Sequence, residues 1–599
     1  MLSNFKTNPL YAFIFVLPFV YGGFHEFVSG LLSVSLLILL IIMFKKGGSG
    51  KGSKKGSLQI PVNISFFAVL SLPVFYLLSA FWAVDRGMAL IGFVKYLPLP
   101  LFVLLSANYP EEKRQACFKA IPYSAALMTV ISFVLSFLPV TKGHITVAGR
   151  LGGFFEYPNT FALFLLLGLI VMSMEGAGKG NTADEGNKGF PQKKKIMGGK
   201  GHIIIQALTA LILLLGIFLS GSRAVFVLLI ISALTVALFS KNKAVRRVTL
   251  AVVPSAVGAA VIFALITNNF YSIGRFLTSS LTESTFVGRL LYFKDAIPQI
   301  LTHPLGQGYG SYLYTQGTFQ TGVYNVKFVH NDFLQLFFEI GWLPALLLTA
   351  AVVCSFFKKG EYQSAGKRLM LAVICIHGMF DFSLQYMAVF FILLLLLDRG
   401  GARTASAGKA AGNVIAFSCG AAAVFCLYFS VACFFEFLGN YAISTAMYPS
   451  YTEGYVHLMI GEQDLTEAKK LSDKITELNQ SVYQTYLIQS AYDFQNGDVL
   501  SAIQNKEKAI SLSPYTFDSY IEYIDMLYAA YNIYTETGDP DSAEYCRKKI
   551  VTVPSLLQEL KERTSSLGMM IDDKPRTELP KEYFDMIEGL YSKRMNKNE

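Results

Sequence analysis

The segments GRLLYFKDAIPQILTHPLGQGYGSY (288–312) and VKFVHNDFLQLFFEIGWLPALLL (326–348) decide how this sequence is interpreted. They belong to a long polar loop that starts near Asn268, ends near Asp332 and is set between hydrophobic stretches. Loops longer than about 15 residues are uncommon unless they are functional or disordered. The density of Phe and Tyr in this loop argues against disorder. We therefore expect the working part of the protein to lie here.

Composition places the loop in a membrane protein. The 599 residues are 53% hydrophobic, and the mean hydropathy is +0.45. Apolar runs such as Leu31–Phe44, Ile203–Leu219 and Val248–Ile266 approach the roughly 20 residues that cross a bilayer. Their spans must be helical, because lipid offers the backbone no hydrogen-bond partners. The sequence predicts an all-α, polytopic membrane protein with about 12–13 transmembrane helices.

Charge distribution predicts the orientation of the loop. Residues 1–439 contain 35 Lys and Arg against 16 Asp and Glu, whereas residues 440–599 contain 16 against 25. Clusters of Lys and Arg mark cytoplasmic loops. Alternating spans place every such cluster on one side, which leaves the long loop and the tail outside; losing one short span would move the tail but not the loop. The clusters lie in Lys45–Ser57, Tyr109–Ala116, Glu175–His202, Ser240–Arg247 and Asp398–Lys409. No basic solvated face suited to nucleic acid is evident.

The pattern divides the chain into four parts. Residues 1–267 hold nine predicted spans, 268–332 form the large extracytoplasmic loop, 333–438 hold the last spans, and 439–599 form an extracytoplasmic tail. Phe333–Phe357 is expected to be one span. Leu369–Phe382 and Tyr386–Leu397 form either a tight helical pair or one broken segment. The seven cysteines show no metal-binding spacing, so we expect neither metal nor cofactor.

The tail has a helical-repeat pattern. Residues Tyr486–Tyr515 place small and apolar residues at helical spacing around a Gly-Asp turn, and Tyr520–Pro554 repeats the layout. His457–Asn479 reads as a degenerate first copy. This pattern predicts tetratricopeptide-like repeats, for which about three copies make a stable stack. An irregular helical cap is the alternative.

His330 is the first candidate for chemistry. It stands at the outer end of a predicted span, with Asn331 and Asp332 as candidate helix caps. Histidine titrates near neutrality and can accept a proton from a hydroxyl. A lone histidine is more often structural, but its place in this loop favours a function.

Two arginines are further candidates. Arg223 follows Ser-Gly-Ser where one span ends and the next begins, and Arg289 stands among apolar residues early in the loop. A guanidinium at the membrane edge is costly unless paired or functional, and its fork of donors suits phosphate. Each could instead be a simple interfacial anchor.

Other candidates are weaker. His303 opens a glycine-rich turn whose spacing is not that of a nucleotide-binding loop. His377 and Asp381 stand one helical turn apart and could pair with each other. Arg150 and Glu156 lie on an outer loop, where Glu156 could orient an arginine or simply make a turn.

Together these residues resemble the O-antigen ligase and polymerase family. The family's ligase pattern is His, then Asn, Ser or Gln, nine residues, then Gly, and here His330-Asn331 is followed by nine residues and Gly341. Arg223 and Arg289 match in context, as do the His-Pro-x-Gly-x-Gly-x-Gly run from His303 and GGFFEYPNTFA (152–162). The resemblance covers roughly Leu10–Leu397. An extra span, Gly412–Phe435, and the repeat tail depart from it.

The resemblance implies an enzyme. It would be a metal-independent glycosyltransferase that moves a glycan from a polyprenyl (undecaprenyl) diphosphate to an acceptor hydroxyl. The reaction would take place on the outer face of the bacterial cytoplasmic membrane, in cell-surface polysaccharide synthesis. His330 would be the general base, and Arg223 and Arg289 would stabilise the leaving diphosphate. His303, Asn331, Arg150, Glu156 and Asp381 would bind substrate. The partners would be the bilayer, the lipid-linked donor, a glycan, lipid or protein acceptor, and a protein bound by the tail.

Two other classes remain open from the sequence. A flippase for lipid-linked sugars would use the same basic groups without breaking a bond, but it should place ionisable groups deep in many spans and often shows internal repeats. A scaffold for envelope assembly would use the tail as its binding module. In a scaffold, substitution of His330 would be harmless.

Overall fold

The computed structural model describes residues 7–46, 57–177, 200–239, 283–358, 364–398, 400–406 and 409–595, and the single positions 246, 254 and 258. The predicted span Val248–Ile266 and the first part of the long loop, 268–282, lie outside the described residues. Most residues of three basic stretches also lie outside the described residues: Lys45–Ser57, Glu175–His202 and Ser240–Arg247.

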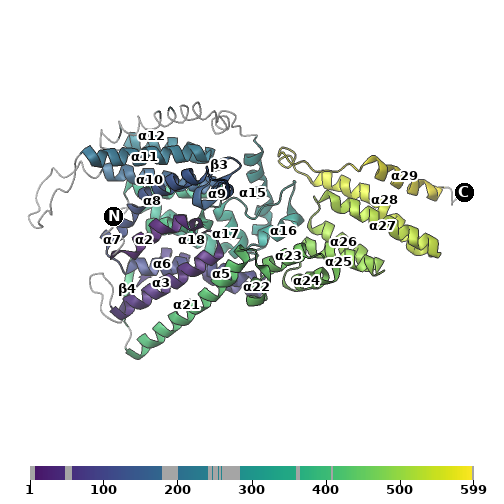
Figure 1. Cartoon of the computed structure of the whole chain (residues 1–599), viewed down its shortest axis with the longest axis horizontal. Coiled ribbons are helices and arrows are strands. Elements are labelled where there is room, and N and C mark those ends of the chain that lie inside the picture. Colours follow the sequence, from purple (N-terminus) through teal and green to yellow (C-terminus); the bar gives the residue numbers. More distant parts are fainter. Residues whose placement is uncertain are drawn as a thin grey trace, which may run out of the picture.

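The described chain is a bundle of apolar helices with a helical tail that extends away from it, to the right in Figure 1. The predicted all-α class is therefore confirmed. Five helical stretches are long and apolar enough to cross a membrane, namely Glu26–Lys46, Ile64–Phe81, Met88–Ala107, Glu111–Leu135 and Ala410–Phe437. Shorter apolar helices accompany them: Pro9–Phe19, Pro158–Met174, Ile204–Ser220, Arg223–Phe239, Trp342–Phe357 and Met387–Leu396. The protein is a multi-pass membrane protein.

Two helices form the centre of the bundle. Every residue of α20 (Met387–Leu396) is buried, and α10 (Pro158–Ala177) buries Phe161–Leu167 completely. A helix that is apolar on all sides is stable only inside a protein or a membrane. By contrast, only 17% of the apolar window of α21 (Lys409–Phe437) is buried. Helix α21 packs along α3 (Glu26–Lys46) at the edge of the bundle, where Gly30 allows the Ser430 side chain to approach.

Loops that the alternation of spans assigns to one side do meet at one end of the bundle. Val84 donates to the carbonyl of Gln307 (2.9 Å), and Arg150 donates to the carbonyl of Ser220 (2.7 Å). At the other end, Asn8 donates to the carbonyl of Lys113 (2.7 Å) and Lys358 bonds to Asp398 (2.7 Å). These contacts agree with the predicted order of spans.

The predicted single span Phe333–Phe357 is wrong. The chain forms two helices there, α17 (Asp332–Ile340) and α18 (Trp342–Phe357), broken at Gly341. Gly341 has φ 79° and ψ −171°, a conformation that is essentially restricted to glycine. Downstream, the helical pair is the correct alternative, because α19 (Ala365–Gly378) and α20 are separate helices joined by a tight connection.

A small sheet joins two stretches that the sequence assigns to inner connections. Strand β1 (Ser57–Val62) pairs antiparallel with β4 (Gly401–Ser406), with Ser57 opposite Ser406. The backbone N–H of Gln59 donates to Asn108 Oδ1 (2.8 Å), which ties the sheet to the end of α6 (Pro98–Ala107). The pairing puts both stretches at the same end of the bundle, as predicted.

The tail is a row of helices in which each packs on the next. After α22 (Tyr441–Met447) the pairs are α23 (Thr452–Gly461) with α24 (Leu465–Leu478), α25 (Tyr483–Gln495) with α26 (Val499–Leu512), and α27 (Phe517–Thr537) with α28 (Pro540–Arg563). The chain ends in α29 (Lys581–Met595). Three hairpins agree with the predicted helical repeat, and their tetratricopeptide nature stays a prediction.

Candidate functional site

Segments far apart in the sequence meet at the carboxylate of Asp381, which lies between α19 and α20. This side chain is 2% exposed. It accepts hydrogen bonds from the Tyr157 hydroxyl (2.8 Å), Asn159 Nδ2 (2.8 Å) and Arg289 (3.2 Å). The backbone N–H of Phe382 donates a fourth (3.0 Å). A buried carboxylate is stable when it is paired and hydrogen-bonded in this way. We call Tyr157, Asn159, Arg289, His330 and Asp381 the Asp381 cluster.

Arg289 comes to the cluster on α15 (Ser284–Thr302). This amphipathic helix buries Val287, Gly288 and Leu291, and the Arg289 side chain is 19% exposed. Its single bond to Asp381 uses one of five N–H donors on the guanidinium, which leaves donors for an anionic ligand.

His330 lies on the same carboxylate. Its Nδ1 is 3.6 Å from Asp381 Oδ1, just beyond hydrogen-bond distance, and this buried atom has no closer polar partner in the described part of the chain. The ring packs edge-on against Phe382 (5.0 Å between centroids) and lies 5.9 Å from Tyr292. Its backbone φ is +58°, which is rare for a residue other than glycine and occurs at functional sites more often than elsewhere.

The chain around His330 is fixed on both sides. Asn331 caps α17, as predicted, because its side chain accepts from the N–H groups of Phe333 and Leu334. Before His330, the N–H of Val329 donates to Gln335 Oε1 (2.8 Å). Asp332 was the other cap candidate, but its side chain instead accepts from the N–H of Leu384 (2.9 Å) and thereby joins α17 to the Asp381 connection.

Electrostatics keep the cluster charged. Burial alone would raise the pKa of the Asp381 carboxyl, but the Arg289 guanidinium and His330 hold that pKa well below its usual range. Burial would lower the pKa of Arg289, whereas Asp381 raises it above its ordinary value. The pair is therefore ionised, and a carboxylate faces His330.

Arg223 does not reach the Asp381 cluster directly. It begins α12 (Arg223–Phe239) and forms a two-pronged ion pair with Glu283, the residue that precedes α15, and it lies 3.3 Å from Thr285 Oγ1. Arg289 lies six positions after Glu283, a rise of about 9 Å along the helix. Arg223 thus anchors the start of the helix that carries Arg289.

Arg150 and Glu156 have different surroundings. Arg150 donates to Asn159 Oδ1 (2.7 Å), so it supports the cluster through Asn159. The possibility that Glu156 orients an arginine is not borne out, because its ion-pair partner is His144 (3.5 Å). Burial raises the pKa of Glu156.

His303 lies away from the cluster. It ends α15, fourteen residues or about 21 Å along the helix from Arg289, and its exposed ring bonds to the carbonyl of Gln299 (2.9 Å). The glycine turn after it packs on the α17–α18 junction. A Cβ on Gly306 would lie 2.4 Å from the carbonyl oxygen of Glu339, and a Cβ on Gly341 would lie 2.3 Å from that of Pro304. The glycines thus allow two backbones to touch.

Sequence reasoning missed two members of the cluster and misjudged a pair. Tyr157 and Asn159 lie in the stretch GGFFEYPNTFA that carries part of the family resemblance, and this was the available signal. The proposed pairing of His377 with Asp381 is wrong as a hydrogen bond: His377 Nδ1 bonds to Ser383 Oγ (2.9 Å). Both residues are buried, so the tight connection between α19 and α20 decides their partners.

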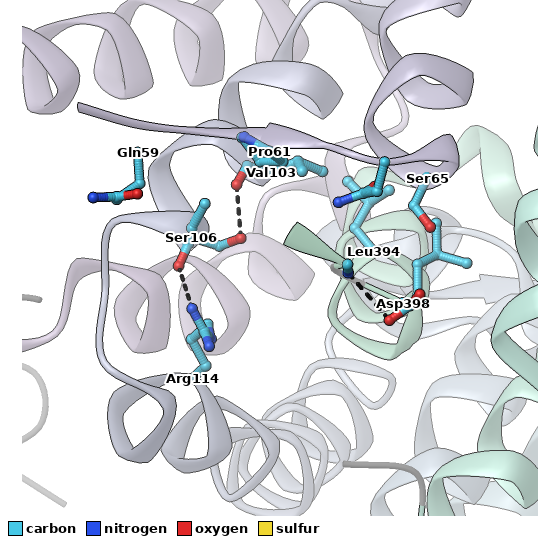
Figure 2. Close-up of a pocket in the computed structure, with 12 residues that line it drawn as sticks. Gln59, Pro61, Ser65, Val103, Ser106, Arg114, Leu394 and Asp398 are labelled. Atoms are coloured by element: carbon cyan, nitrogen blue, oxygen red, sulfur yellow. Dashed lines mark hydrogen bonds between the residues drawn. The ribbon is translucent and has the colours of Figure 1, made fainter. Parts of the chain in front are cut away.

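A cavity of about 240 Å³ lies at the opposite end of the bundle. Figure 2 shows Gln59, Ser106, Arg114 and Asp398 around it. The ten residues of α20 separate this cavity from the Asp381 connection, a rise of about 15 Å. Its arginine already bonds to Glu111 and to the carbonyls of Ser106 (3.2 Å) and Tyr109 (2.9 Å). The cavity is therefore separate from the candidate site.

One group of side chains in the described residues has a metal-ligand arrangement. Glu436, Glu453 and His457 bring one ligand atom each within 4.8 Å of one another, at the junction of α21 with the tail. Glu453 is also ion-paired with Lys327 (3.2 Å). The group lies outside the Asp381 cluster, which contains a single histidine and a single carboxylate.

One comparison with known proteins gives a match to part of the chain. No curated protein and no solved structure matches the chain. Residues 208–350 match a family model described as O-antigen ligase, and this segment contains Arg223, Arg289 and His330 but not Tyr157 or Asp381. Through this segment the chain is similar to the O-antigen ligase family.

Proposed function

We propose that the protein is a membrane glycosyltransferase that moves a glycan from a polyprenyl diphosphate, of the undecaprenyl type, to an acceptor hydroxyl. The family supports a glycan ligase or polymerase, and the finer assignment rests on one observation. A histidine, an arginine and a buried carboxylate share one site at the end of the bundle where the long loop folds.

His330 is the general base in this proposal. Its Nδ1 is buried against Asp381, so Nε2 is the nitrogen left to meet a substrate. The acceptor hydroxyl attacks the anomeric carbon, its proton passes to Nε2, and the bond from that carbon to the diphosphate oxygen breaks with its electron pair on the diphosphate. The Asp381 carboxylate stabilises the imidazolium that forms, and a positioned base typically contributes 10²–10⁴-fold.

Arg289 is the better placed of the two arginines to stabilise the diphosphate. Its guanidinium is partly exposed and keeps donors free of Asp381, whereas Arg223 engages Glu283 through both terminal nitrogens. A preorganised cation at the leaving group lowers the barrier without reorganisation during the reaction. Arg223 acts on this step through the position of α15. The resemblance and the basic clusters together support an outer-face site in a bacterial cytoplasmic membrane.

The test is glycan transfer in membranes with a lipid-linked glycan donor. Intact protein, His330→Ala and His303→Ala are compared, because both histidines belong to one loop and only His330 lies in the cluster. We expect His330→Ala to lose transfer while it still inserts and binds donor, and His303→Ala to retain it. Product size then separates a polymerase from a ligase. Equal transfer by the intact protein and His330→Ala would refute the mechanism and favour a transporter or scaffold.

A further inference from the structure

The tail touches the neighbourhood of the candidate site at two independent places. One contact is made by Glu453 in α23, and the other by residues 565–572, which follow α28 and which we call the strap. Each contact is made with a part of the long loop that carries one of the two main candidate residues, His330 or Arg289. The first reaches the segment before His330, and the second reaches α15, which carries Arg289.

The first contact fixes the approach to His330. Lys327 Nζ lies 3.2 Å from Glu453 Oε1, and Glu453 raises the pKa of this lysine above its ordinary value. Next to it, Phe328 stacks on Phe382, the neighbour of Asp381, at 4.8 Å between ring centroids. Only two residues separate Lys327 from His330, so the tail ion pair holds a short, fully packed segment that ends at the candidate base.

The second contact starts just after α16 (Ser311–Phe319). The N–H of Ser565 donates to the carbonyl of Thr321 (2.9 Å), and Thr321 in turn bonds to Asp295 of α15 through its N–H (2.8 Å). Gly568 and Gly322 then allow the two backbones to pack directly against each other. A Cβ on Gly568 would lie 2.3 Å from the Thr321 carbonyl oxygen and 2.9 Å from Gly322 Cα.

The strap then runs along the first turns of α15. Ile571 is 5% exposed and packs with Val287 and Leu291, the residues on either side of Arg289 on the buried face. The N–H of Asp572 donates to Ser284 Oγ (2.8 Å) at the first residue of the helix. The strap therefore holds the start of α15, while Arg223 holds the residue just before it.

We propose that the tail is part of the catalytic unit, with Glu453 and the strap as positioning elements for His330 and Arg289. This inference rests on the proposed function, since it gives these two residues the roles of base and leaving-group cation. A strained residue such as His330 keeps its conformation only where its surroundings over-determine it. The tail supplies part of that constraint, so any partner or acceptor bound to the tail would act on transfer through these contacts.

The first test removes the ion pair from one side and then from both. Lys327→Met and Glu453→Leu each leave one partly buried charge without its partner in this pair, while the double variant removes both charges. Removal of one partner of a buried pair is destabilising, but apolar replacement of both is often neutral. We expect each single variant to lower kcat by on the order of 10²-fold through misplacement of the base. The acid limb of the pH profile should shift too, because His330 faces Asp381, Arg289 and Tyr292. The double variant should recover most of the original kcat and most of the original pH profile.

The matched control is Glu522→Leu. It breaks an ion pair within the tail, Lys506 with Glu522, which lies between α26 and α27 and away from the loop. We expect kcat and the pH profile to stay unchanged. For the strap, Gly568→Ala is compared with Gly461→Ala, whose Cβ would meet nothing within 4 Å. Only Gly568→Ala should lower kcat.

Hydrogen exchange measures the effect of the tail on these segments independently of catalysis. In Glu453→Leu, amides 327–332 should exchange faster; in Gly568→Ala, amides 284–292 should do so. Unchanged exchange and unchanged kcat in these variants, with His330→Ala inactive, would overturn this proposal and leave the proposed function intact. Normal transfer by His330→Ala would instead overturn the proposed function, and faster exchange in the tail variants would then show positioning without catalysis.

Discussion

Asp381 sets the charge balance of the candidate site, because one buried carboxylate faces a histidine and an arginine at once. In Asp381→Asn, Arg289 loses its counter-charge and His330 loses the group that stabilises its protonated form. Loss of one partner of a buried pair costs about 3–5 kcal/mol. We expect kcat to fall by on the order of 10²–10⁴-fold, measured as single-turnover glycan transfer.

Tyr157→Phe is the matched control for that change. It removes one hydrogen bond to Asp381 and keeps the ring and the charge. A hydrogen bond to a charged group contributes about 1.5–3 kcal/mol, so the expected loss is on the order of 10–10²-fold and smaller than that of Asp381→Asn. If Tyr157→Phe were as damaging as Asp381→Asn, the tyrosine rather than the carboxylate charge would dominate the site.

Single residues were predictable where their surroundings are local. His330, Arg289 and the cap at Asn331 follow from the sequence because a helix start and an amphipathic stretch are read within a few residues. Tyr157 could not be assigned a partner in this way, since Asp381 lies 224 positions further along the chain. His303 was expected to bind substrate near His330, because spacing along a loop does not reveal which end of α15 meets the cluster.

At the scale of elements, the break at Gly341 determines where α17 directs His330. The α17–α18 junction packs closely on the glycine turn, backbone against backbone, so Gly341→Ala meets both a forbidden backbone conformation and the Pro304 carbonyl. We expect a loss of about 3 kcal/mol or more in the free energy of unfolding. The midpoint of thermal unfolding in detergent measures this loss.

Gly310→Ala provides the comparison for Gly341→Ala. Gly310 has φ +68°, but a Cβ there would meet nothing within 4 Å. Only the left-handed backbone penalty of about 1 kcal/mol applies. Similar losses in the two variants would show that backbone conformation, rather than the close packing of the turn on α17, governs the junction.

Hydrophobic runs predicted most helices but not how they connect. A run of apolar residues carries no signal for the interruption at Gly341, because glycine is common inside membrane helices. The β1–β4 sheet was missed for a different reason: its strands lie 339 positions or more apart, so neither has a neighbouring partner in the sequence. The strap was missed for the same reason, because the sequence of residues 565–572 resembles an ordinary linker and does not reveal its contact with α15.

At the scale of the whole molecule, the two ends of the bundle should face opposite compartments. Residues 57–62 and 401–406 pair at one end, and the Asp381 cluster lies at the other. We expect His303→Cys, in an exposed position of the cluster end, to react with a membrane-impermeant thiol reagent in intact cells. Arg403→Cys should react only after the membrane is opened. Unmodified protein gives the background, and reversed labelling would invert the proposed orientation.

The docking of the tail on the bundle should depend on pH through Asp85. This carboxyl is 1% exposed in the connection between Phe81 and α5 (Met88–Tyr96), where Asn479 of the tail donates to it at 3.3 Å. Burial raises its pKa from 3.8 to about 6, which outweighs the hydrogen bonds that lower it. The docked state therefore favours the protonated acid, and docking is strongest below about pH 4.

As the pH rises from about 4 to about 6, the undocked carboxyl ionises first, and docking should weaken by about 3 kcal/mol. Hydrogen exchange of amides 448–482 between pH 4 and pH 7 measures the change. Asp85→Asn keeps the shape and removes the charge, so its exchange, corrected for intrinsic rates, should lose this part of the pH dependence. An identical pH dependence in both proteins would assign the effect to another group at the junction. Because the same tail holds Lys327 and α15, a weaker junction at higher pH should also lower transfer, and this effect should be absent in Asp85→Asn.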